Sequence, residues 1–349
     1  MAENPFVSPR ITLSDFPDEI DEYFYSHGYT DGLPIVPPSV DRVKQFVEAT
    51  GKRPQEVVGL VPPLMGSATV ERVAINAVMA GCRPEYMPTF LAAVSAVCDP
   101  QFNLSTIQST TNPASPLLIL NGPQRKRLDV NSGSGCFGPG WRANATIGRA
   151  LRLVLLNVGG GKPGVVDKAT QGYPGKYTFC FAENEEESPW EPLAVERGFA
   201  PADDTITAVG GHGTSNIVET SPRAEDVLTS LAFGLINTGV NNFMNARSDV
   251  LLVLCPSHAQ IIANGGKFTK QMLKEYLWER ARAPFDWFSE RRQSEIRLRK
   301  ATILNDRVLI TDRPENFIIV IAGGPGGLHS TFIPTVTGTQ SVTRPIRSS

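Results

Sequence analysis

The order of apolar runs and helical patterns after residue 200 most constrains the fold of this chain. In chain order the segments are a run ending at Val209, a helix at 224–239, a run at 249–255, helices at 259–265 and 269–282, and a run at 316–324. Apolar runs separated by helices are typical of parallel strands that are covered on both faces. We therefore predict that residues 201–349 form an α/β domain with a mostly parallel sheet covered by helices.

Two regions of different character precede this domain. Residues 1–100 read mostly as helices joined by proline-rich connectors, and they predict a helical N-terminal layer. Residues 101–200 contain short apolar runs between long stretches rich in Gly, Asn and Pro. They predict a loop-rich α/β central region with glycine-rich loops, where functional residues often lie. The whole chain is accordingly expected to belong to the α/β class.

The charge balance and the cysteine content restrict the partners and the cellular compartment that we expect for this protein. Lys and Arg number 33 against 35 Asp and Glu, so nothing indicates a nucleic acid or an anionic membrane as partner. The longest apolar stretches are shorter than the roughly 20 residues that span a bilayer, and the first residues lack the pattern of a signal peptide. The five cysteines have no metal-finger spacing and are odd in number, which favours reduced thiols and a cytoplasmic location.

Three of the four histidines lie close to an apolar run or the loop after it. His212 is flanked by glycines in GGHGTS, His258 follows Cys255 in CPSHAQ, and His329 follows GGPGGL. In an open α/β sheet, ligands bind beyond the carboxyl ends of the strands. We therefore expect these histidines to converge as acid/base groups or as ligands of a divalent metal such as zinc.

A glycine-rich turn before the helix at 143–160 is a second candidate site. Its free backbone N–H groups would favour a carboxylate or phosphate, and Cys136 in this turn is a candidate nucleophile because a helix N-terminus stabilises a thiolate. The candidate substrate-binding residues of the region are Asn121, Gly135, Asn144, Arg149, Lys176 and Glu183. Asp31 and Asp167 are further acidic candidates, although a turn role is the commoner explanation for an Asp before Gly32.

Several stretches resemble a known family. They are TDGLPIVPPSVDRV, NGP, ANATIGRALRL, AENEEESPWEPL and CPSHAQIIANGG, and they recur along nearly the whole chain. They are similar to bacterial proteins labelled by a selenocysteine- or cysteine-Gly-Ser-Cys motif. The resemblance implies thiol or selenol chemistry with a small cytosolic partner protein or fused segment that carries the motif. This chain has SGSGCFGPG at 132–140 but no Cys-Gly-Ser-Cys, so the resemblance does not assign that role to Cys136.

Three functions follow from these patterns. The first is an enzyme, a hydrolase or lyase rather than an oxidoreductase, that hydrolyses, hydrates or eliminates a small polar or anionic molecule with the three histidines. The second is a thiol-redox subunit that uses Cys136 or Cys255 with a partner. The third is a non-catalytic binding or scaffold component whose charged segment 286–300 docks a partner. Soluble enzymes commonly self-associate, so a homo-oligomer is expected.

Overall fold

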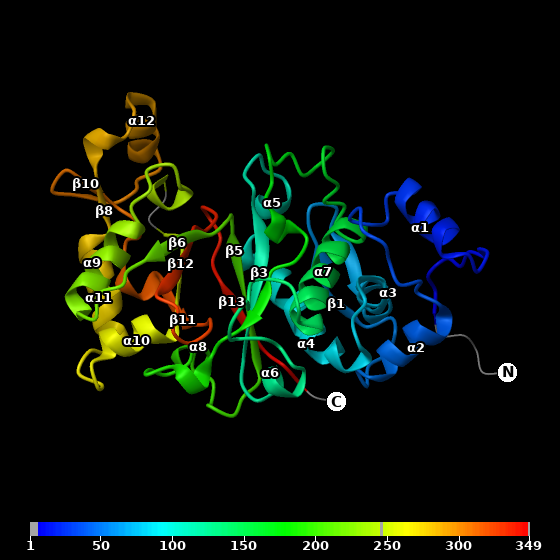
Figure 1. Cartoon of the computed structure of the whole chain (residues 1–349). Coiled ribbons are helices and arrows are strands. Elements are labelled where there is room, and N and C mark those ends of the chain that lie inside the picture. The colour runs from blue at the N-terminus through cyan, green and yellow to red at the C-terminus, as the bar shows by residue number, and fades with distance from the viewer. Residues whose placement is uncertain (1–5, 245–246, 348–349) are drawn as a thin grey trace.

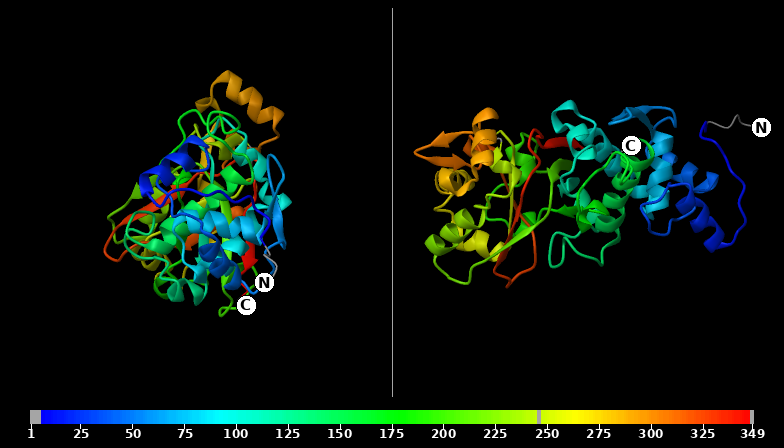
Figure 2. Two further views of the ribbon diagram at one scale, coloured as in Figure 1. Left: turned by 90° about the vertical axis from the view of Figure 1, so that its right-hand side faces the viewer. Right: turned by 90° about the horizontal axis from the view of Figure 1, so that it is seen from above.

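The computed structural model describes residues 6–244 and 247–347. It confirms the α/β class, with helices and two larger mixed sheets. Figure 1 shows four layers side by side: the N-terminal helices, a first sheet in the centre, a second sheet, and a further layer of helices. Figure 2 shows that these layers follow one another along the long axis of the molecule.

The helices expected from individual sequence segments are present with shifted ends, and further helices, most of them short, accompany them. The helices are α1 (Pro17–Ser26), α2 (Val40–Glu48), α3 (Val70–Ala80), α4 (Met87–Val97), α5 (Leu104–Gln108), α6 (Gln124–Arg127), α7 (Arg142–Asn157), α8 (Leu193–Glu196), α9 (Ala224–Gly234), α10 (Pro256–Ala263), α11 (Lys270–Arg280) and α12 (Glu290–Leu298). Gly81 ends α3 in the left-handed conformation, with φ of 86°, which glycine adopts without a steric cost. Ile296 is the one buried residue of α12, so this charged helix lies on the surface.

The strands form two small sheets and two larger ones. The strands are β1 (Val57–Val61), β2 (Gly66–Thr69), β3 (Ser115–Asn121), β4 (Cys180–Ala182), β5 (Thr205–Gly211), β6 (Ser215–Val218), β7 (Val250–Leu254), β8 (Arg282–Pro284), β9 (Ile303–Leu304), β10 (Arg307–Leu309), β11 (Phe317–Ile321), β12 (His329–Ile333) and β13 (Val342–Pro345). The first large sheet has the order β13-β5-β3-β4, and the second has the order β11-β7-β12-β6.

The two larger sheets have the same internal pattern. In each, one parallel pair (β3 with β4, β7 with β11) is extended by two antiparallel strands (β5 and β13, β12 and β6). The outer strands are exchanged, because β6 follows β5 in the chain but pairs with β12, and β13 follows β12 but pairs with β5. The sheet of the C-terminal part is therefore mixed, where a mostly parallel one was predicted. The short strands β6, β12 and β13 lack the long apolar runs on which that prediction depended.

Strands β3, β5, β7 and β11 are buried on both faces, which explains why they are continuous, mostly apolar runs. One core lies between the two sheets and includes Leu117 and Ile119 of β3, Leu251 and Val253 of β7, and Phe181 of β4. The alternate residues of β3 face the core with α3, α4 and α7, and the alternate residues of β7 face the core with α9, α10 and α11. The two sheets thus pack face to face between two helical layers.

The carboxyl ends of the two parallel pairs lie at the same edge of the molecule. The backbone N–H of Asn184, which follows β4, donates to the carbonyl of Ile321 at the end of β11 over 2.7 Å. The glycine-rich loops 132–140 and 323–327 also meet at this edge, since the N–H of Gly323 donates to the carbonyl of Ser132 over 2.9 Å. A Cβ atom on Gly324 would lie 1.7 Å from the Ser134 hydroxyl oxygen, so this contact requires glycine.

Within the described parts of the chain, no helix combines the length and the apolar character that crossing a membrane requires.

Candidate small-molecule site

A pocket of about 550 Å³ opens beside the second half of α7, between the segment 163–177 and the turn at Thr30. We call it the α7 pocket. Its charged lining residues are Asp31, Arg152, Asp167 and Lys176, and its apolar wall includes Leu156, Pro163, Tyr173, Pro174 and Tyr177. Since α7 follows β3 through a crossover, this half of the helix lies at the amino end of β3. The pocket is therefore at the edge opposite to the one where the carboxyl-end rule predicts a ligand.

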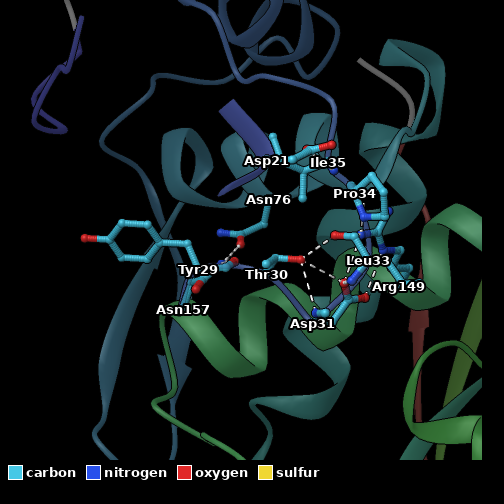
Figure 3. Close-up of polar contacts among 11 residues, drawn as sticks. Asp21, Tyr29, Thr30, Asp31, Leu33, Pro34, Ile35, Asn76, Arg149 and Asn157 are labelled. Carbon is cyan, nitrogen blue, oxygen red and sulfur yellow. Dashed lines mark hydrogen bonds and ion pairs between the residues drawn. The ribbon is translucent and has the colours of Figure 1, made fainter. Parts of the chain in front are cut away.

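The turn at 30–34 is fixed to α7 by a bidentate ion pair (Figure 3). Arg149 donates from Nε to Asp31 Oδ2 and from Nη2 to Asp31 Oδ1, both over 2.9 Å. Its Nη2 also donates to the carbonyl of Pro34 over 2.8 Å. Burial raises the pKa of Asp31, but the hydrogen bonds and charge of Arg149 outweigh burial, and the pKa is lowered overall. The sequence predicted that Arg149 binds a substrate. In the structure Arg149 instead holds the carboxylate of Asp31 in its own chain.

Two cations of the pocket share one carboxylate. Lys176 Nζ lies 2.8 Å from Asp167 Oδ2, whereas Arg152 Nη1 is 3.8 Å from the same oxygen. Arg152 Nη2 makes one longer hydrogen bond, 3.3 Å, to the carbonyl of Gly161. Because Arg149 neutralises Asp31, the lining keeps one positive charge in excess. The Arg152 side chain is only 10% exposed, so water screens this charge poorly.

Lys176 and Tyr173 in the pocket also have shifted pKa values. Burial lowers the pKa of Lys176, and the neighbouring Asp167 carboxylate opposes this shift without cancelling it. Burial raises the pKa of Tyr173 to about 12, so that its phenol is neutral at physiological pH. A lysine with a lowered pKa beside a cation that is not fully neutralised is a pattern found at functional sites.

Sequence reasoning singled out Lys176, Asp167 and Asp31 but missed Arg152 and Tyr173. Arg152 lies three residues after Arg149 in a helix that is otherwise mostly apolar, and this spacing puts both guanidinium groups on one side of α7. That spacing is a signal that could have been used. Tyr173 has no comparable signal, because its loop position carries no periodicity.

The remaining predicted substrate-binding residues hold the chain together elsewhere. Asn144 is buried at the start of α7, where it accepts from Asn131 N–H over 2.8 Å and donates to the carbonyls of Asn131 and Cys136. Gly135 is part of the loop that Asn144 clamps, with φ of 73°. The structure therefore gives Asn144 and Gly135 a role in shaping the loop before α7.

Asn121 and Glu183 form a buried pair at the carboxyl ends of β3 and β4. Asn121 Nδ2 donates to Glu183 Oε2 over 2.7 Å, and the same oxygen accepts from the N–H of Leu193. Burial raises the pKa of Glu183. Both side chains are fully buried, so neither lies where a substrate from solvent could contact it.

The three histidines do not form one cluster. His258 bonds to Ser330 near the start of β12, and the backbone of His212 bonds to Pro334 just beyond the end of that strand, about 13 Å further at the usual strand rise. His329 is exposed at the first position of β12 and contacts Asn216. Its side chain points to the face opposite to that of its neighbour Ser330, because side chains alternate along a strand. Burial lowers the pKa of His212.

Among the residues that the structure describes, no group of three or more His, Cys, Asp or Glu side chains is arranged to hold a metal ion. The expected histidine ligand set for zinc or another divalent metal is therefore not assembled by these residues.

The thiols differ from the expectation as well. Cys136 packs in the core between the sheets, and burial raises its pKa to about 12. The raised pKa keeps this thiol neutral, which does not suit the nucleophile that the sequence predicted at this position, since the thiolate is the reactive form. Burial also raises the pKa of Cys255, but hydrogen bonding to His258 outweighs it and the pKa is lowered overall. Of the two thiols that the sequence proposed as reactive, Cys255 is the one with a suitable environment.

Comparison of the chain with protein-family models, with curated proteins and with solved structures finds no match.

Proposed function

We propose that this protein is an enzyme that binds a small organic anion in the α7 pocket and transfers a proton to or from it. The observation that carries the proposal is the Arg152 guanidinium, which is buried in the pocket wall while the Asp167 carboxylate lies closer to Lys176 and the Asp31 carboxylate is held by Arg149. Isolation of a charge from water is costly unless a partner compensates it. A ligand carboxylate would supply that partner and could pair with Arg152 in a bidentate geometry.

Lys176 is the acid/base group in this proposal. Its lowered pKa makes the neutral amine more accessible near neutral pH than that of an ordinary lysine. The amine would take a proton from a carbon next to a carbonyl group, and Arg152 would stabilise the negative charge that develops on the oxygen. Hydration and elimination both proceed through such a proton transfer, so a lyase fits the pocket better than a hydrolase. The apolar wall with Tyr173 and Tyr177 would hold the body of the substrate.

Binding is tested first, with probes that separate charge from shape. Benzoate and hexanoate should raise the melting temperature of the full chain and give heat on calorimetric titration, whereas neutral benzamide should do neither. Arg152→Gln should abolish binding. Arg291→Gln is the matched control, because Arg291 on α12 is 90% exposed. Equal binding of benzoate by the wild type and by Arg152→Gln would refute the site.

Catalysis is tested separately through hydrogen exchange. In D₂O, NMR should show faster exchange of the C3 protons of 2-oxohexanoate with the wild type than with buffer alone. Lys176→Gln should lose this exchange but retain benzoate binding. If anions bind but the C3 protons of 2-oxohexanoate do not exchange faster than in buffer, the pocket belongs to a non-catalytic binding protein and the catalytic proposal is wrong.

We also propose that the protein works in the cytoplasm as a homo-oligomer, with a small thiol or selenol protein as a further partner. Free cysteines throughout the chain support a reducing compartment, and the exposed helix α12 offers a surface for association. Light scattering coupled to size exclusion measures the oligomeric state directly, and a monomer at micromolar concentration would contradict the proposed assembly.

A further inference from the structure

A second cluster of reactive side chains lies at the end of β7, in the second sheet and away from the α7 pocket. Cys255 is the N-cap of α10, and its sulfur accepts a hydrogen bond from the backbone N–H of His258 over 3.5 Å. Burial raises the pKa of the Cys255 thiol, but the imidazole and the backbone N–H of His258 outweigh burial and lower it overall. A thiol at a helix N-terminus next to an imidazole is the arrangement that activates a cysteine nucleophile.

The orientation of the imidazole is fixed by a third group. His258 Nε2 lies 2.9 Å from the backbone carbonyl of Glu219, and because a carbonyl only accepts, Nε2 carries the hydrogen. Nδ1 is therefore an acceptor, and the Ser330 hydroxyl donates to it over 2.7 Å. The Ser330 oxygen in turn accepts from the N–H of Cys255 over 3.4 Å. Three elements, α10, β12 and the end of β6, thus converge on one imidazole.

A glycine-rich loop bordered by open space lies beside Cys255. Ala322, the residue after β11, donates its N–H to the carbonyl of Leu254, which places the start of the glycine-rich loop 323–327 beside Cys255. A Cβ atom built on Gly323, Gly326 or Gly327 would meet no atom within 4 Å, so open space borders the loop. The His258 side chain is fully buried, and Cys255 is 4% exposed.

We infer that Cys255 and His258 form a second reactive site, a nucleophilic thiol–imidazole pair that accepts an acyl group from a small ester or thioester. The sulfur attacks the carbonyl carbon, a C–S bond forms, and the bond from that carbon to the leaving oxygen or sulfur breaks. His258 receives the thiol proton at Nδ1 and passes it to the leaving group. Water then attacks the acyl carbon with Nδ1 as the base, the C–S bond breaks, and the sulfur regains its proton.

The decisive experiment uses p-nitrophenyl acetate and the full chain at neutral pH. We expect a rapid release of one equivalent of p-nitrophenolate per chain, and mass spectrometry of peptides should find the acetyl group on Cys255. Cys255→Ser and His258→Gln should both lose the rapid release. Cys82→Ser is the matched control, because a serine there can keep the hydrogen bond that Cys82 donates to the carbonyl of Thr146. Absence of a rapid phase, or acetylation at another residue, would overturn the inference.

A second measurement needs no variant and so does not depend on the folding of His258→Gln. The wild-type chain is treated with iodoacetamide, and the rates at all five cysteines are compared by mass spectrometry. We expect Cys255 to react at least tenfold faster than Cys82 and Cys98, although both of these are more exposed. A rate for Cys255 at or below theirs would show that the pair does not activate the thiol.

Discussion

Loss of the ion pair between Asp31 and Arg149 should destabilise the whole N-terminal part of the fold. The pair joins residues 118 positions apart, and the two side chains are 2% and 15% exposed. Removal of one partner from a buried pair typically costs 3–5 kcal/mol. The cost of Asp31→Asn should be at the lower end of this range, about 3 kcal/mol, because Arg149 keeps the carbonyls of Leu33 and Pro34 as acceptors. At about 2 °C for each kcal/mol in a chain of this size, the melting temperature should fall by about 6 °C.

The sign of the pH dependence gives this prediction a second readout. Burial raises and Arg149 lowers the pKa of Asp31, and the net shift is downward from the ordinary 3.8. The ionised carboxylate therefore stabilises the fold above the unfolded-state pKa, and this stabilisation is lost as the pH falls through the lowered folded-state pKa. The difference in the free energy of unfolding between the wild type and Asp31→Asn should therefore be largest near pH 7 and should shrink in strongly acidic buffer.

The assay is thermal unfolding followed by circular dichroism, together with urea titration. Asp286→Asn serves as the control, because Asp286 is exposed and should change stability by less than about 0.5 kcal/mol. The reasoning is refuted if Asp31→Asn unfolds within 1 °C of the wild type, or if its deficit grows as the pH is lowered.

Three further predictions follow from other parts of the structure. Asp167→Asn removes the carboxylate that opposes the effect of burial on Lys176, so the pKa of Lys176 should fall further and the rise of exchange activity with pH should move to lower pH; a shift to higher pH in NMR-monitored rates would contradict this. Phe181→Ala opens a cavity between the two sheets and should cost about 3–5 kcal/mol in urea unfolding, and a loss below about 1 kcal/mol would show that the core collapses around it. Gly324→Ala should cost about 1–3 kcal/mol through its clash with Ser134, and adding Ser134→Gly should restore most of that loss, which a calorimetric comparison of the single and double variants checks.

Local patterns in the sequence predicted most of the helices and the central strands. Helix α3 shows why: its apolar residues recur at helical spacing and Gly81 stops it, so the signals lie within a dozen residues of one another. The same applies to β7 and β11, whose continuous apolar runs reflect burial on both faces. Strands β6 and β13 escaped prediction because they are short edge strands with partly exposed residues, and their pairing partners are distant in the chain.

The candidate site was predictable only in part. Lys176 and Asp167 could be singled out as charged residues in a glycine-rich loop, but nothing in the sequence pairs them with each other or with Arg152. Arg149 had the right chemistry for a carboxylate, yet the carboxylate it binds is Asp31. The histidines were placed near strand ends by their sequence, and the order of strands in the sheets then separated them.

The sequence by itself determined the α/β class, the positions of the helices and the loops that carry the polar residues, because these depend on periodicity, capping and composition over short stretches. The tertiary structure alone decided the exchange of β6 and β13 between the sheets and the excess charge of the α7 pocket. It also decided the position of His258, whose ring contacts Ser330 and the backbone carbonyl of Glu219. These features arise from residues tens to hundreds of positions apart. Their interaction energies depend on distance and burial in three dimensions, which no local pattern encodes.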